Sequence, residues 1–316
     1  MARTRQKDMR MAAHAGDWYS SNRHELEAQL AKWLEQVEGP NPIQGCKAII
    51  APHAGYAYSG PAAAWAYKSI DTTGIKRVFV LGPSHHIYIN GCALSACNVY
   101  HNLNGDLPLD LDTIQELRAT GKFEEIALAA EEAEHSLEMH LPYIRKIFEG
   151  KDIAIVPIVV GAIGQQQEAE FGALLAPYLA RDDTFCVVSS DFCHWGTRFS
   201  YTYYYPGPDE HAVRLSRSTN PSEEHPIHTS IRKLDHAAMD LLTHQPSEAH
   251  KPFAEYLEET KNTICGRHPI GVLLGALATL APERPAELKF VRYEQSSECF
   301  TIRDSSVSYA SAWVKF

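Results

Sequence analysis

Residues 48–56 read AIIAPHAGY and contain the pattern from which the fold can be inferred. A short apolar run of strand length ends directly in a turn that carries His53. The same pattern recurs twice: 78–81 ends before His85 and His86, and 185–188 ends before Asp191 and His194. These runs are apolar throughout and do not alternate, which is typical of strands that are covered on both faces.

The order of the predicted elements indicates a central sheet with helices on its faces. A capping signal at Asn22 precedes apolar residues at helical spacing over 26–37, and helices separate the apolar runs. A fourth strand is predicted at 153–160, helices at 227–242 and 271–280, and closing strands at 289–293 and 307–314. We therefore expect an α/β fold in a single domain, with a largely parallel or mixed sheet.

The composition excludes several classes of protein. The 316 residues carry a net charge of −10, so no excess of Lys and Arg is available to neutralise the phosphates of a nucleic acid. No apolar stretch approaches the roughly 20 residues that cross a bilayer, and no secretory signal follows the start. The 7 cysteines, an odd number, favour a reduced, intracellular, cytoplasmic protein.

The predicted domain boundaries follow from local composition. Residues 1–10 are basic and are interpreted as a solvated tail, which leaves 11–316 as the single domain. The segment 206–226 is rich in Pro, Ser and Glu, and it is predicted to be a surface excursion within that domain.

The histidine-bearing turns predict a shared site. Ligands of open α/β sheets bind beyond the carboxyl ends of the strands, and parallel strands would bring His53, His85 and His194 to the same edge. A single histidine is more often a packed or surface residue, but three such turns favour a common site. Imidazoles that converge with a thiolate or a carboxylate can bind zinc, iron or copper.

Two further segments are candidates for the site. His135 and His140 are five residues apart, which does not match the spacing of two zinc ligands on one helical face; a polar helix start is an equally good interpretation. Cys265 precedes a helix and lies near Arg267, which favours a lowered thiol pKa, although an inert buried cysteine fits the pattern equally well. Motifs of nucleotide-dependent enzymes and of serine hydrolases are absent from the sequence.

Several long motifs resemble the signature segments of the Memo family. They are HAGDWY at 14–19, APHAGY at 51–56, LGPSHH at 81–86, EHSLEMHLPY at 134–143, SSDFCHWG at 189–196, NTICGRHPIG at 262–271 and DSSVSYA at 304–310. The resemblance covers the chain from about residue 10 onward, apart from the 206–226 segment.

The resemblance implies a fold similar to that of the class III extradiol dioxygenases, which are non-haem iron enzymes. It implies that His53 and His85 are metal ligands, with Cys265 at the position of the glutamate ligand of those enzymes. It also implies that His194, with Asp191 nearby, corresponds to their acid/base histidine. We expect the surrounding pocket to include His14, Trp18, His86, His135 and His140, with His86 as the rival of His85 for the metal.

Two functions of different classes follow from this resemblance. The first is an intracellular metal-binding regulatory protein that acts in signalling to cell motility and the cytoskeleton and in redox or metal homeostasis. Its ion is expected to be iron or copper, with zinc as an alternative. Its expected partners are signalling proteins or phosphotyrosine peptides, in the cytoplasm and also in the nucleus. The second is a metal-dependent oxidoreductase of the extradiol dioxygenase type, against which Cys265 argues because it replaces a carboxylate.

Overall fold

Parallel strands form the centre of the sheet in the computed structural model, which describes residues 8–207, 210–216, 218 and 221–316. In spatial order these strands are β2 (Cys46–Ala51), β9 (Thr184–Ser189), β3 (Arg77–Pro83) and β8 (Ala154–Val160). Nearly every residue in them is buried, as expected for strands covered on both faces. Because they are parallel, their carboxyl ends lie at one edge.

Antiparallel strands extend this centre on both sides and make the sheet mixed. The long strand β14 (Ser306–Lys315) pairs with β2, and it also pairs with β13 (Glu287–Gln295) and β10 (His194–Trp195). On the other side, β4 (Cys92–Leu94) pairs antiparallel with β8, and β7 (Phe123–Glu125) runs parallel to β4. The predicted α/β fold with a mixed, mostly parallel sheet in a single domain is confirmed.

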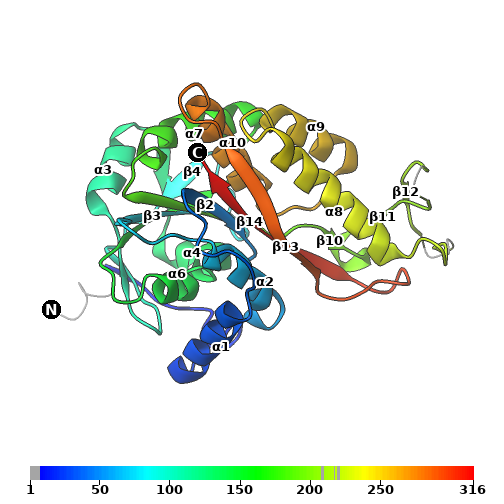
Figure 1. Cartoon of the computed structure of the whole chain (residues 1–316), viewed down its shortest axis with the longest axis horizontal. Helices are drawn as coiled ribbons and strands as arrows, with labels where there is room; N and C mark the ends of the chain where they lie inside the picture. Colours follow the sequence, from blue (N-terminus) through cyan, green and yellow to red (C-terminus); the bar gives the residue numbers. More distant parts are fainter. Residues whose placement is uncertain (1–7, 208–209, 217, 219–220) are drawn as a thin grey trace.

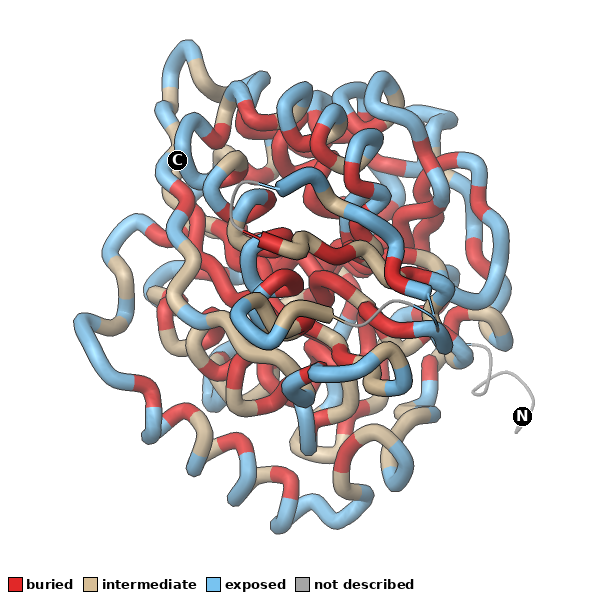
Figure 2. Tube along the Cα trace, turned by 90° about the vertical axis from the view of Figure 1, so that its right-hand side faces the viewer, coloured by how far each residue is buried: buried red, intermediate tan, exposed pale blue. Residues whose placement is uncertain are grey.

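Helices cover the two faces of the sheet (Figure 1). On one side α7 (Gln165–Leu179) and α10 (Arg267–Leu280) pack on β9, and on the other α2 (Tyr56–Lys68) packs on β2 and β14. The other helices are α1 (Arg23–Glu35), α3 (Leu111–Ala119), α4 (Leu128–Ala133), α5 (His135–Glu138), α6 (Leu141–Ile147), α8 (Ile227–His244) and α9 (His250–Thr260). Figure 2 shows the buried residues gathered in the interior and the exposed ones along the outer turns of the helices.

The predicted elements agree closely with those observed. The Asn22 side chain caps α1 by accepting hydrogen bonds from the backbone nitrogens of His24 and Glu25. The closing strands are longer than predicted, and α10 begins at Arg267, whereas the sequence placed its start near 271.

The amino-terminal segment belongs partly to the folded domain. Residues 1–7 of the predicted basic tail lie outside the described residues. Arg10 lies in the short strand β1 (Met9–Arg10), which pairs with β5 (Val99–Tyr100), and its side chain is completely buried. The Arg10 guanidinium pairs with Glu138 at 2.8 Å, so this arginine is a core residue and not part of a solvated tail.

The predicted excursion at 206–226 is described only in part. Its strand β12 (Val213–Arg214) is exposed and pairs with β11 (Tyr203–Tyr204). Residues 208–209, 217 and 219–220 fall outside the description. Across the parts of the chain that are described, no helix is both long and apolar enough to cross a membrane.

The contact between α7 and α10 sets the position of the segment that carries Cys265. Glu168 of α7 accepts hydrogen bonds from His268 of α10 at 2.7 Å and from His250 of α9 at 2.8 Å. Burial alone would raise the pKa of Glu168, but these hydrogen bonds outweigh it and lower the pKa. The carboxylate therefore stays ionised and joins the three helices.

Replacing Gly172 by alanine tests this close packing. A Cβ at Gly172 would lie 2.5 Å from the backbone nitrogen of Ala276 and from the carbonyl oxygen of Val272. We expect Gly172→Ala to lower the free energy of unfolding by about 1–3 kcal/mol, because α7 and α10 must move apart. Chemical denaturation measures this loss. Gly164→Ala, where a Cβ meets nothing within 4 Å, should lose less; equal losses would contradict the packing argument.

Candidate functional site

A cavity of about 650 Å³ opens at the carboxyl ends of β2, β3 and β9. The side chains that could do chemistry there are His53, His85, His135, Asp191 and His194, with Trp18 at the wall. His53 follows β2, His85 follows β3 and Asp191 follows β9, so the parallel strands bring the three predicted turns together at one edge.

Hydrogen bonds fix both the backbone and the ring of His53. Its backbone nitrogen donates to Asp191 Oδ1 at 2.8 Å, and its Nδ1 lies 2.6 Å from Ser189 Oγ. The Ser189 hydroxyl donates its only proton to the carbonyl of Ser136. It must therefore accept a hydrogen bond from His53 Nδ1–H. Nε2 of His53 is therefore the nitrogen with a free lone pair. Burial lowers the pKa of His53 well below its ordinary value, which keeps the ring neutral.

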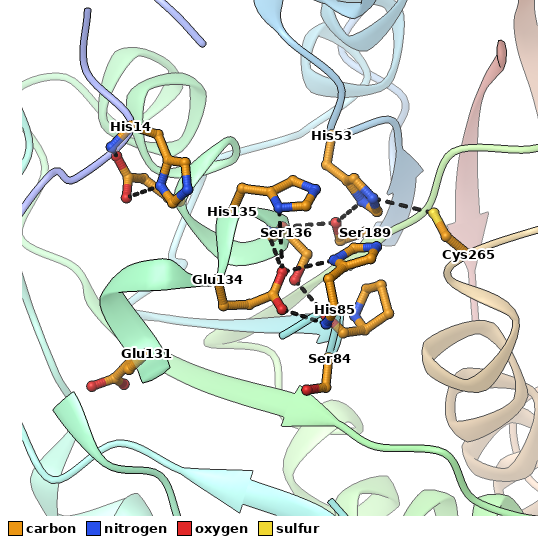
Figure 3. Close-up of polar contacts among 12 residues, drawn as sticks. His14, His53, Ser84, His85, Glu131, Glu134, His135, Ser136, Ser189 and Cys265 are labelled. Carbon is orange, nitrogen blue, oxygen red and sulfur yellow. Dashed lines mark hydrogen bonds and ion pairs between the residues drawn. The ribbon is translucent and has the colours of Figure 1, made fainter. Parts of the chain in front are cut away.

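His85 is held by a buried carboxylate (Figure 3). Glu134 accepts from the backbone nitrogen of His85 at 2.6 Å and from its Nδ1 at 2.8 Å. Burial would raise the pKa of Glu134, but its hydrogen bonds with His85 lower it to about 2. The ionised carboxylate accepts a hydrogen bond from the protonated Nδ1, which leaves Nε2 of His85 with a free lone pair. Both His85 and His86 are exposed, but only His85 lines the cavity, so His85 is the residue of this pair that faces it.

Cys265 contacts His53, which lines the cavity, from outside the lining residues. Its Sγ lies 3.2 Å from His53 Nε2 and accepts from the backbone nitrogen of Asp191 at 3.3 Å. The predicted lowering of the thiol pKa is wrong for the metal-free protein. Burial, followed by the nearby charge of Asp191, raises the pKa of Cys265 well above its ordinary value, and Arg267 lowers it too little to compensate. The thiol is therefore protonated and donates to the free lone pair of His53.

His135 is stacked between two rings of the cavity. Its ring lies 4.2 Å from that of Trp18 and 4.4 Å from that of His85, with interplanar angles of 29° and 20°. Burial lowers the pKa of His135 to about 3. Ligand atoms of His53, His85 and His135 lie within 4.8 Å of one another, which makes these three a possible metal site within the described part of the chain.

The amino-terminal segment supports this stack through Glu138. His14 Nδ1 lies 2.9 Å from Glu138 Oε2, and Tyr19 donates to Glu138 Oε1 at 2.8 Å. Burial would raise the pKa of Glu138, but hydrogen bonding with His14 and the charge of Arg10 lower it to about 2. His14 stands edge-on to Trp18 beside the cavity, with ring centroids 5.7 Å apart.

His194 and Asp191 also line the cavity. His194 Nδ1 lies 2.9 Å from the carbonyl oxygen of Phe192 and 3.1 Å from that of Thr263. Carbonyl oxygens only accept, so Nδ1 carries the proton and Nε2 is the nitrogen able to accept one. Burial raises the pKa of Asp191, whose Oδ1 is already engaged by the backbone of His53.

His140 is a correction to the expected pocket. Its ring is buried in the core, where Nδ1 lies 2.7 Å from the hydroxyl of Tyr67, and it does not line the cavity. The chain turns into α6 directly after His140, which directs this ring away from the edge where His135 lies.

Two residues that orient His53 and His85 were missed by the sequence analysis. They are Glu134, which orients His85, and Ser189, which orients His53. Glu134 also caps α5 by accepting from the nitrogen of Ser136, and an acidic residue at such a helix start is a signal that could have identified it. Ser189 lies inside a predicted strand end and offers no comparable local signal.

Known proteins resemble the chain over nearly its whole length. Protein MEMO1 of Xenopus laevis is 44% identical over 306 residues, and that of Homo sapiens is 44% identical over 305 residues; both alignments cover 96% of each chain. Protein memo-1 homolog of Caenorhabditis elegans is 40% identical over 305 residues, which cover 96% of this chain and 81% of that protein. A crystal structure of an uncharacterized protein from Escherichia coli matches with a TM-score of 0.45 and 14% identity, covering 83% of this chain and 99% of the other.

The match to a protein family agrees with the matches to individual relatives. The sequence description of the family "Memo-like protein" matches residues 10–313, which include every side chain that lines the cavity. Together with the identity to MEMO1 proteins across 96% of the chain, this match shows that the protein belongs to the Memo-like family.

Proposed function

We propose that this protein is a metal-binding regulatory protein, in which His53, His85 and Cys265 hold one transition-metal ion. The observation that carries the proposal is the contact of Cys265 with His53, a residue that lines the cavity together with His85. Cys265 Sγ lies 3.2 Å from His53 Nε2, and the rings of His53 and His85 stand edge to face with centroids 5.2 Å apart. A metal ion would replace the proton that the thiol now donates to His53.

The donors and their supports fit a transition metal. Both histidines have Nδ1 engaged, by Ser189 and by Glu134, which is the outer arrangement that fixes the tautomer of metal-binding histidines. Imidazole and thiolate donors favour copper, zinc and iron over Mg²⁺ and Ca²⁺, which prefer oxygen. We propose iron or copper as the ion, with zinc as the alternative.

Cys265 is preferred to His135 as the third ligand because of ring geometry. His135 is stacked on His85 with ring centroids 4.4 Å apart and an interplanar angle of 20°, so the lone pairs of the two rings lie in separate, nearly parallel planes that do not meet near the rings. Two rings stacked in this way cannot both direct a nitrogen at one ion. His53 meets His85 at 74°, an angle that allows both nitrogens to point at a common position.

The rest of the cavity supports binding of a further ligand. Its volume of about 650 Å³ exceeds what an ion and its water need, and Arg198 lines it together with Tyr58 and Trp18. We propose that it takes peptides of signalling partners, including phosphotyrosine peptides, and that the protein acts in cytoplasmic and nuclear signalling to motility and redox control. The family resemblance supports these finer roles, and the cation and aromatic rings suit such a ligand.

The alternative function is a metal-dependent oxidoreductase. It is supported by His194, whose Nε2 is free to accept a proton, and by the neighbouring Asp191. Cys265 in place of a carboxylate argues against ring cleavage. We expect the Fe(II)-loaded protein, given catechol, to consume oxygen no faster than the His194→Ala variant does. An oxygen electrode measures both rates. Consumption that requires both Fe(II) and His194 would favour the oxidoreductase.

Metal titration tests the ligand assignment. Replacing His53 or His85 by Ala, or Cys265 by Ser, should weaken binding of Zn(II) and Cu(I) by at least about 100-fold, because loss of an outer partner alone costs 10- to 100-fold. His135→Ala should have a smaller effect. Competition with a chromogenic chelator measures the affinities, and His24→Ala on the exposed face of α1 is the control. A loss in His135→Ala as large as that in Cys265→Ser would instead assign the ion to three histidines.

Proton release gives an independent test of the thiol. Because the raised pKa keeps Cys265 protonated at neutral pH, binding of Zn(II) should release about one proton per ion. Isothermal titration calorimetry in two buffers of different ionisation enthalpy measures this number. The Cys265→Ser variant should release none. Equal release by both proteins would show that the proton does not come from Cys265.

A further inference from the structure

A fully buried carboxylate, Asp235, lies behind the cavity on α8. It accepts hydrogen bonds from the backbone nitrogen of Cys193 at 3.2 Å, from Asn262 Nδ2 at 3.1 Å and from the hydroxyl of Tyr293 at 2.9 Å. None of these three donors carries a positive charge. Burial raises the pKa of Asp235, and such a group is costly to bury without a counter-ion. Its presence therefore calls for a reason.

The first hydrogen bond holds the loop that follows β9. Cys193 lies between Asp191 and His194, and its side chain is fully buried. The backbone of this loop is also anchored to β14, because the nitrogen of Phe192 donates to the carbonyl of Ser308. Asp235 thus fixes the loop from the side opposite the cavity.

The second hydrogen bond holds the loop that leads to Cys265. Asn262 is followed by Thr263. The Thr263 hydroxyl accepts a hydrogen bond from the backbone nitrogen of His194 at 2.7 Å and donates one to the backbone carbonyl of His194 at 3.0 Å. The same loop ends at Cys265, whose Sγ contacts the backbone of Asp191. The two loops are therefore hydrogen-bonded to each other through Thr263 and Cys265, and both are hydrogen-bonded to Asp235.

We propose that Asp235 is a positioning residue that fixes His194 and Cys265 relative to each other. The inference rests on the proposed metal site in that Cys265 is taken as a ligand. Tyr293 holds the second carboxylate oxygen from β13, so one side chain joins three separate parts of the chain.

The bonding pattern predicts which substitutions preserve this role. Cys193 and Asn262 both donate to Oδ1, and Tyr293 donates to Oδ2. An asparagine at position 235 can keep Oδ1 toward both loops and place its amide group at the Tyr293 hydroxyl, which can also accept. Alanine offers no acceptor and leaves the Cys193 N–H buried without a partner.

The experiment compares Asp235→Ala and Asp235→Asn in the full-length, metal-free protein. We expect Asp235→Ala to raise the iodoacetamide alkylation rate of Cys265 by at least about tenfold, because the loop opens more often. The ¹⁵N shifts of the His194 ring should also lose the signature of an Nδ1-protonated tautomer. Asp235→Asn should restore both readouts. In a parallel zinc titration, Asp235→Ala should weaken binding by about tenfold.

The control is Glu131→Gln, which alters another buried acid that the hydroxyl of Tyr100 contacts and that touches neither loop. If this variant changes the Cys265 rate and the His194 shifts as Asp235→Ala does, the effect is general destabilisation and the proposal is wrong. Unchanged readouts in Asp235→Ala would also overturn the proposal.

If Asp235→Ala does not fold, Asn262→Ala removes one hydrogen bond of the same network and must speed the alkylation of Cys265. Failure of wild-type protein to bind zinc would refute the metal site alone, since the thiol and tautomer readouts need no metal.

Discussion

The close contact between Gly266 and the turn after β9 is the constraint on which the cavity depends. A Cβ at Gly266 would lie 2.3 Å from the carbonyl oxygen of Ser189, so only glycine lets the chain approach this closely. The approach places Cys265 against the backbone of Asp191 and its sulfur next to His53. Because β2 and β9 are neighbouring parallel strands, His53 and Asp191 lie side by side at the same edge of the sheet.

The electrostatics of the cavity prepare it for a cation. Ionised carboxylates stand behind the histidines, with Glu134 behind His85 and Glu138 behind His14, and the pKa of each is held at about 2. Burial keeps His53 and His135 uncharged. Neutral rings backed by negative charge favour a cation in the cavity, whereas protonated imidazoles would repel it.

The short helix α5 connects these features. Glu134, which caps its start, orients His85, Ser136 donates to the carbonyl of Pro83 at the end of β3, and Glu138 accepts from the amino-terminal segment. His135 on the same helix enters the cavity. One helical turn thereby ties the end of β3, the segment around His14 and the aromatic stack to one another, and Arg10 completes the support by pairing with Glu138.

The fold class and the convergence of the histidine turns could both be predicted from the sequence. The apolar runs around Ile49 and Val187 predicted buried parallel strands, and parallel strands must share one edge, so His53 and Asp191 had to meet. The position of Cys265 was implied only by family resemblance, because it and His53 are separated by 212 residues and no local pattern records their contact.

The tertiary structure alone decided which of the neighbouring side chains face the cavity. His85 and His86 are both exposed, but only His85 lines the cavity, and His140 is buried against Tyr67. The tertiary structure also reversed the expected direction of the Cys265 pKa shift. Burial and the charge of Asp191 depend on residues that approach from other parts of the chain, and the sequence around a cysteine cannot specify them.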